Sequence, residues 1–174
     1  TATSTKPVPT GIGTAKITVN DSTIDADTIN LINSYSSGAV TSSAATVQGG
    51  ASAVKTALTA AGVTYSAGLA AGAGLTPVKA TVTDSSVDAV TLTAINAATA
   101  GLVTTTATTI TGTASNVQTA LDTANTEITG LSAVNVVLDD PDTAGTQKYS
   151  VAAVRGIIKA TTGKVTATVS EGDV

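Results

Sequence analysis

The chain has no cysteine, histidine, methionine, tryptophan or phenylalanine, and three tyrosines are its only aromatic residues. Without cysteine and histidine it can form no disulfide, no zinc site of the Cys/His kind, no thiol nucleophile and no imidazole base. Aromatic side chains usually bury on the order of 150 to 250 Å² each. Their scarcity predicts a thin, regular interior of small apolar residues with little room for a deep ligand pocket. We therefore expect a protein that is not an enzyme.

Charge is scarce as well, with 11% charged residues and a net charge of −4. This is too little to keep a chain with 42% apolar residues disordered by self-repulsion, so a folded protein is expected. Half of the eight cations fall near the end of the chain, at Lys148, Arg155, Lys159 and Lys164. They are spaced among apolar residues without aromatic platforms, which indicates a solvated helix face rather than a nucleic-acid site. No apolar run reaches 18 residues, so no membrane span is expected.

The lack of cysteine fits an exported protein, and we expect an extracellular or cell-surface location. The chain begins with Thr1 instead of methionine. This suggests a processed chain or a fragment of a longer one.

What the chain does contain is a repeat. Residues 17–58 recur as residues 80–121 at a constant offset of 63 positions, without a gap. A self-similar period of this length is typical of stacked or strung repeats, in which each unit buries its apolar face against its neighbours. Matching positions include Asp21/Asp84, Asp25/Asp88, Ile32/Ile95, Asn33/Asn96, Gly38/Gly101, Val40/Val103, Gly49/Gly112, Val54/Val117 and Leu58/Leu121. The pairs Ile32/Ile95, Val54/Val117 and Leu58/Leu121 are predicted to be buried at equivalent places.

Each unit alternates short strands with short helices. Residues 17–19 alternate as a strand does, residues 20–22 favour a turn, and Asp25 precedes a helical stripe that ends before Gly38. Short β-prone pieces at residues 39–40 and 46–47 then lead to a second helix. The joints between units fall at residues 63–77 and 128–131.

A third, divergent unit begins with a strand at residues 136–138. It continues with a helix through residues 151–158, a stop at Gly163 and a strand at residues 165–169. Helices that alternate with short strands favour parallel strands joined by helical crossovers. We therefore predict an α/β repeat architecture that resembles a solenoid, with tandem small α/β or β-sandwich modules as the alternative. The expected divisions are an extended arm or linker at residues 1–16 and units at residues 17–78, 79–133 and 134–174.

Two acidic pairs recur with the repeat, Asp21/Asp25 and Asp84/Asp88. They could ligate Ca²⁺ through oxygen, or they could form an Asx turn and a helix N-cap. The capping role is the better fit, because two carboxylates supply too few ligands for an ion that takes about 6 to 8 oxygen ligands. The two pairs are also poor candidates for acid/base catalysis, because they recur with the repeat, whereas an active site needs only one copy of its catalytic residues.

Another calcium candidate is the segment at residues 140–145, with the sequence DPDTAG. It matches the start of a calcium loop at its first, third and sixth positions, but it has Ala144 at the fifth position and Val151 at the twelfth. The candidate ligands are Asp139, Asp140 and Asp142. The alternative is an exposed turn around the proline. No other cofactor is expected, because the glycine pairs at residues 11–13 and 72–74 lack the rest of a phosphate-binding motif.

Three phrases carry a family resemblance: TVTDSSVD at residues 81–88, TITGTASNV at residues 109–117 and ITGL at residues 128–131. They resemble the Thr/Ala-rich repeats of very large secreted bacterial surface proteins, including cyanobacterial ones. In that group such repeats accompany haemolysin-type calcium repeats, adhesins or surface-layer segments. This chain lacks the Gly-Gly-x-Gly-x-Asp nonapeptides, so calcium-dependent folding is not implied.

The resemblance implies scaffold, spacer or adhesin work outside the cell. We expect a non-catalytic structural module of a surface layer, filament or adhesin, which acts through self-association or through flanking repeats of a longer chain. Residues 1–14 could serve as a donor strand or tether in such an assembly. The alternatives are a phage or virion fibre or decoration protein and a carbohydrate-binding module, although three tyrosines are a poor supply of sugar-binding platforms.

Overall fold

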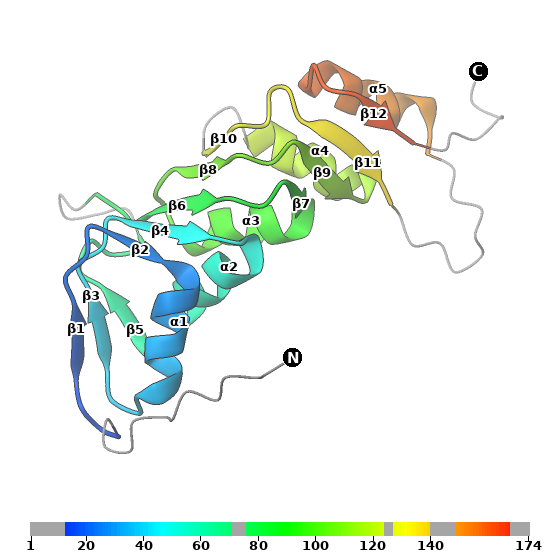
Figure 1. Cartoon of the computed structure of the whole chain (residues 1–174). Coiled ribbons are helices and arrows are strands. Elements are labelled where there is room, and N and C mark those ends of the chain that lie inside the picture. The colour runs from blue at the N-terminus through cyan, green and yellow to red at the C-terminus, as the bar shows by residue number, and fades with distance from the viewer. Residues whose placement is uncertain (1–12, 71–75, 124–126, 140–148, 168–174) are drawn as a thin grey trace.

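The computed structural model describes residues 13–70, 76–123, 127–139 and 149–167. Figure 1 shows an elongated molecule in which the helices follow one another in a row beside the strands. The protein is α/β, with parallel sheets whose strands alternate with short helices, as predicted. Neighbouring helices in the sequence are also neighbours in space, from α1 through α5.

The elements of the first two units follow the same order, and the described part of the third unit contains fewer elements. The first unit contains β1 (Ile17–Val19), β2 (Thr23–Asp25), α1 (Ala26–Tyr35), β3 (Val40–Ser42), β4 (Thr46–Gly49), α2 (Ala51–Thr59) and β5 (Val63–Tyr65). The second unit contains β6 (Lys79–Val82), β7 (Ser86–Asp88), α3 (Ala89–Ala98), β8 (Val103–Thr105), β9 (Thr109–Gly112), α4 (Ala114–Thr123) and β10 (Ile128–Thr129). The third unit contains β11 (Asn135–Leu138), α5 (Val151–Ala160) and β12 (Val165–Thr166).

Four of these strands were not predicted as strands. β2 and β7 have three residues each and lie directly before α1 and α3, and β2 follows the turn that was expected at residues 20–22. β5 and β10 lie inside the segments that the sequence marked only as joints. Each of these four strands has one buried position, which is too few for alternation to reveal a strand.

The three sheets are arranged so that consecutive units share one. The sheet orders are β1-β3-β5, β10-β8-β6-β4-β2 and β12-β11-β9-β7, and all their pairs are parallel. In the first unit β2 and β4 form a second sheet, and β6 extends it, although β6 corresponds in sequence to β1. The same step is repeated when β11 pairs with β9. The second unit therefore begins with a strand that extends the β2–β4 sheet of the first, and the third unit begins with a strand that extends the β7–β9 sheet of the second.

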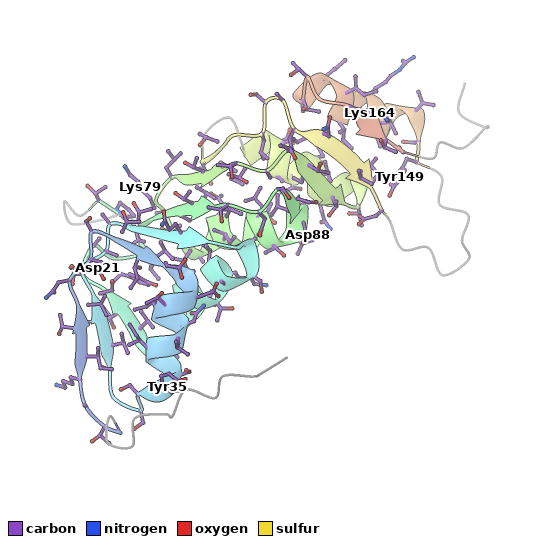
Figure 2. All side chains as sticks on the ribbon, in the orientation of Figure 1. Asp21, Tyr35, Lys79, Asp88, Tyr149 and Lys164 are labelled. Carbon is purple, nitrogen blue, oxygen red and sulfur yellow. The ribbon has the colours of Figure 1, made fainter. Side chains whose placement is uncertain are left out.

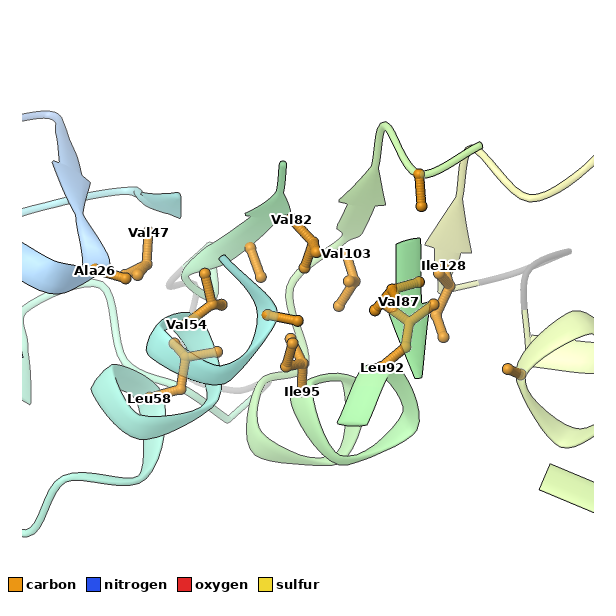
Figure 3. Close-up of a cluster of buried hydrophobic side chains, with 14 of the residues drawn as sticks. Ala26, Val47, Val54, Leu58, Val82, Val87, Leu92, Ile95, Val103 and Ile128 are labelled. Atoms are coloured by element: carbon orange, nitrogen blue, oxygen red, sulfur yellow. The ribbon is translucent and has the colours of Figure 1, made fainter. Parts of the chain in front are cut away.

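The core is a single cluster of small apolar side chains between the strands and the helices (Figure 3). Its largest fully buried members are Ile29, Leu92, Ile95, Ile110, Ile128, Leu131 and Ile157. The predicted burial of Val54/Val117 and Leu58/Leu121 is confirmed, with at most 4% of any of these side chains exposed. Ile95 is also fully buried, but its counterpart Ile32 is only half-buried. That part of the prediction is wrong, because α2 packs on α3, whereas no preceding helix packs on α1 in the described part of the chain.

The helices α1, α3 and α5 begin in the same way. The amide groups of Thr28 and Thr91 donate to the carboxylates of Asp25 and Asp88 at 3.0 and 2.8 Å, and the Ser150 hydroxyl caps α5. An N-cap of this kind stabilises a helix by about 1 kcal/mol. The capping role predicted for Asp25 and Asp88 is therefore confirmed.

The same three helices also end alike, in a Ser/Thr-x-Gly motif. The hydroxyl group of Ser36, Thr99 or Thr161 accepts a hydrogen bond from the glycine amide two residues later, at 3.0 Å in each case. Each hydroxyl also donates to a carbonyl just before the first strand of its unit, on Ala15, Val78 or Val134. The motif therefore recurs in the third unit as it does in the first two. It also confirms the predicted helix stops at Gly38, Gly101 and Gly163.

Candidate functional site

The residues that recur in this chain meet at the joint between units. At the first joint β6 pairs with β4, and the amides of Lys79 and Thr83 donate to the carbonyls of Ala45 and Gly49 at 2.9 and 3.0 Å. α2 packs across both strands and against α3. Main-chain hydrogen bonds and apolar packing therefore cross the boundary between the first two units without interruption.

Asp84 closes this joint. Its Oδ2 atom accepts a hydrogen bond from the amide of Ala51, the first residue of α2, at 2.6 Å. The N-cap residue of α2 is Gly50, which has no side chain to cap the helix. In the second unit the corresponding residue is Thr113, whose hydroxyl accepts from the amide of Asn116 at 3.3 Å. The sequence predicted a local turn or a calcium ligand at Asp84, but the structure shows a cap supplied by the following unit.

Gly49 allows the joint to close. It lies opposite Val82 in the β4–β6 pair and has φ of +144°, a backbone conformation that residues with a side chain rarely adopt. Gly112 repeats this geometry opposite Leu138 in the β9–β11 pair, with φ of +139°. The repeated Gly49/Gly112 position is thus explained by the ends of the two strands that receive the next unit.

The calcium candidates lie beyond the second joint. Asp139 is exposed just after β11, and its amide donates to the carbonyl of Gly112 at 3.2 Å. Asp140 and Asp142 lie outside the described residues, as does the turn that was the alternative. Within the described ranges no three acidic side chains are grouped closely enough to hold a metal ion. A calcium site at Asp139, Asp140 and Asp142 stays a prediction.

A hollow of about 520 Å³ lies beside the end of α3, lined by Leu69, Ala70, residues 96–102 and Glu127. Its polar side chains are already engaged. The Asn96 amide group donates to the Glu127 carboxylate at 2.5 Å, and the Thr99 hydroxyl donates to the Val78 carbonyl. Among the described residues of the lining, Glu127 is the one titratable group, and it is already bonded to Asn96.

Tyr65 is the buried polar side chain that closes the first unit. Its hydroxyl group donates to the carbonyl of Ala57 in α2 at 3.2 Å. Burial raises the pKa of Tyr65 from 10.0 to about 12, because the surrounding apolar side chains cannot solvate a phenolate. The role of this tyrosine is to hold β5 against α2.

No protein-family model matches the chain, and neither a curated protein nor a solved structure matches it. None of the helices in the described ranges is long and apolar enough to cross a membrane. The function of the protein is therefore inferred from its own residues.

Proposed function

We propose that this protein is a non-catalytic structural module of a bacterial cell surface, in which repeat units join end to end as a scaffold or spacer. One observation carries the proposal: the joint between the first and second units is used again between the second and third. In both, a first strand extends the preceding sheet, as β6 does on β4 and β11 does on β9. A joint that is used twice can be used further.

The chemistry of the repeated residues supports this role. Asp25 and Asp88 cap helices, Asp84 caps a helix across a joint, and the repeated Val54, Val117, Leu58 and Leu121 are buried. The caps and the buried side chains hold the fold together, and Asp84 also holds one unit to the next. To separate two units, main-chain hydrogen bonds must break and buried apolar side chains must be exposed to water, which makes the joint stiff.

The location is proposed from composition and resemblance. The chain lacks cysteine, carries little charge and has Thr/Ala-rich phrases that resemble those of large secreted surface proteins. The partners of such a module are flanking repeats or other copies of the chain. No metal or organic cofactor is needed for the proposed role.

Labelling of intact cells tests the location. An antibody raised against the folded chain is expected to label unpermeabilised cells of the organism that makes it, and brief protease treatment of these cells is expected to remove the label. A cytoplasmic protein probed in the same cells is the control, because its signal must appear only after permeabilisation. Labelling that requires permeabilisation would contradict the proposal, and labelling confined to virus particles would support the fibre alternative.

A further inference from the structure

β1 is an edge strand, although its counterpart in the second unit is not. β6 lies inside its sheet between β4 and β8, whereas β3 is the one strand that pairs with β1 in the described part of the chain. The amides of Lys16 and Asn20 correspond to those of Lys79 and Thr83, which bond to the preceding unit. Within the described residues, the amides of Lys16 and Asn20 have no acceptor. Such a row of unpaired groups is a template for a further parallel strand.

Apolar side chains at this end are less buried than their counterparts. Three residues of the first unit are half-buried where those of the second are at most 1% exposed; the pairs are Ile17/Ala80, Val19/Val82 and Ile32/Ile95. The cover over the second unit comes from α2, which packs on β6 and α3. No helix in the described ranges occupies that place for β1 and α1. Leu31 and Tyr35 on α1 are 53% and 38% exposed and make this end still more apolar.

Asp21 completes the comparison. It is the counterpart of Asp84 and lies in the turn between β1 and β2, where Figure 2 shows it at the outer end of the first unit. Asp84 accepts a hydrogen bond from the first amide of α2. Asp21 is exposed and has no partner among the described residues. The acid that caps the preceding unit is thus present at this end without a helix to cap.

We infer that this end, formed by β1, the outer face of α1 and Asp21, docks the trailing end of another repeat unit placed in tandem before it. A strand of the β4 type pairs with β1, and a helix of the α2 type covers Ile17, Val19 and Ile32. The first amide of that helix donates to Asp21. This inference rests on the proposed function, because it names the partner that a scaffold unit takes.

The internal joint identifies the occupant. It shows which surface fits a first strand of this kind, namely the β4–α2 end of a unit. In the described part of the chain, β6 already covers β4, and β11 already covers β9. A second copy of the chain has no free end of this type in its described residues, so a tandem unit is the partner that fits.

A tandem duplication tests the inference. A second copy of residues 17–79 is inserted between Lys16 and Ile17, so that the Lys79 of the copy precedes Ile17 as Lys16 does in the parent chain. Urea denaturation is then measured for both chains, with and without Asp21→Ala in the original unit. We expect Asp21→Ala to leave the parent midpoint unchanged. In the duplicated chain it should lower the midpoint by as much as Asp84→Ala lowers that of the parent.

Asp27→Ala is the matched control, since Asp27 is an exposed acid of α1 whose counterpart Val90 stays 48% exposed in the second unit, where the internal joint is made. It should shift the midpoint equally in the two chains. Hydrogen exchange measured by mass spectrometry gives a second test. The two copies of β1 in the duplicated chain otherwise yield identical peptides, and the Asp21→Ala substitution gives the peptide of the original copy a different mass. Asn20 and its neighbours should exchange more slowly in the duplicated chain than in the parent.

Several results would overturn the inference. The duplicated chain could unfold in separate transitions, or Asp21→Ala could leave its midpoint unchanged. Asp21→Ala could also destabilise the parent, with an effect that vanishes on deletion of residues 1–12 or on dilution, which would make the chain's own arm or a second chain the occupant. The urea measurement uses purified protein and does not depend on the location of the protein in the cell. A failure of surface labelling would therefore contradict the proposed function without changing the result for docking.

Discussion

The carboxylate of Asp84 accepts a hydrogen bond from the amide of Ala51, 33 residues earlier in the sequence, at 2.6 Å. The donor belongs to the first unit and the acceptor to the second, so this one contact reports whether the two units are docked. We expect Asp84→Ala to lower the free energy of unfolding by about 1 kcal/mol, the usual cost of a lost N-cap. Asp84→Asn should lower the free energy of unfolding by less than Asp84→Ala does, because an amide oxygen can still cap the helix.

Asp122→Ala is the control for charge in this measurement, since Asp122 is exposed in the last turn of α4. It should change the free energy of unfolding by less than about 0.5 kcal/mol. Equal effects of the Asp84 and Asp122 substitutions in urea denaturation would contradict the capping role.

Leu121 is 2% exposed at the position that corresponds to Leu58. Leu121→Ala should lower the free energy of unfolding by about 2 to 5 kcal/mol, because it removes buried methyl groups and leaves a cavity. Leu31→Ala is the matched control, since the same atoms are removed from a side chain that is 53% exposed. Thermal denaturation followed by circular dichroism compares the two. Similar losses for both variants would show that Leu121 is not a core residue of the second unit.

Gly101 leaves no space for a side chain. A Cβ atom added there would lie 2.1 Å from the carbonyl oxygen of Val78, so the strand that leads into the second unit must shift. We expect Gly101→Ala to cost about 1 to 3 kcal/mol, as overpacked sites do. Gly13→Ala is the control, because nothing lies within 4 Å of a Cβ atom at that position. Unfolding midpoints that coincide for the two variants would refute the Ser/Thr-x-Gly motif as a constraint.

Tyr65 makes the stability of the protein depend on pH above 10. Its pKa is about 12 in the folded protein and near 10.0 when it is exposed. Its contribution is fully present below pH 10 and is lost as the pH rises toward 12, because the unfolded chain releases the phenol proton first. A difference of this size corresponds to at most about 3 kcal/mol.

The Tyr65→Phe variant isolates this effect, because every other ionisable group is the same in the two proteins. The variant loses the hydrogen bond to Ala57 at neutral pH, but its stability should fall less than that of the parent between pH 10 and pH 12. Urea midpoints measured over this range check the prediction. Parallel pH profiles for the two proteins would rule out Tyr65 as the source.

The second unit shows how much of the fold could be predicted from sequence. The 63-residue period identified the module, and the polar residues before the apolar stripes, together with Gly101 after the first of them, located the helices. Local chemistry decides these features, since an N-cap such as Asp88 bonds to an amide three residues away. The burial of Val117 and Leu121 followed from their place on the helical stripe.

The candidate sites could be predicted only in part. Asp25 and Asp88 were correctly assigned as caps, because their partners are close in sequence. Asp84 could not be assigned, since its partner is on another unit and nothing in the local sequence indicates Ala51. The sequence contained one indirect signal of this contact. Gly50 stands where the second unit has the capping residue Thr113, so α2 needs a cap from elsewhere. Asp140 and Asp142 of the calcium candidate lie outside the described residues.

The module, its helices and its small apolar core could be predicted from the chain alone, because helical periodicity and capping act over a few residues. The pairing of β6 with β4, while the counterpart β1 lies at an edge of the described sheet, became visible with the tertiary structure. The same kind of strand occurs in both places, and the difference lies in whether a unit precedes it within the described chain. Pairing between units depends on surfaces brought together from distant parts of the chain, so Ile95 is buried whereas the equivalent Ile32 is only half-buried.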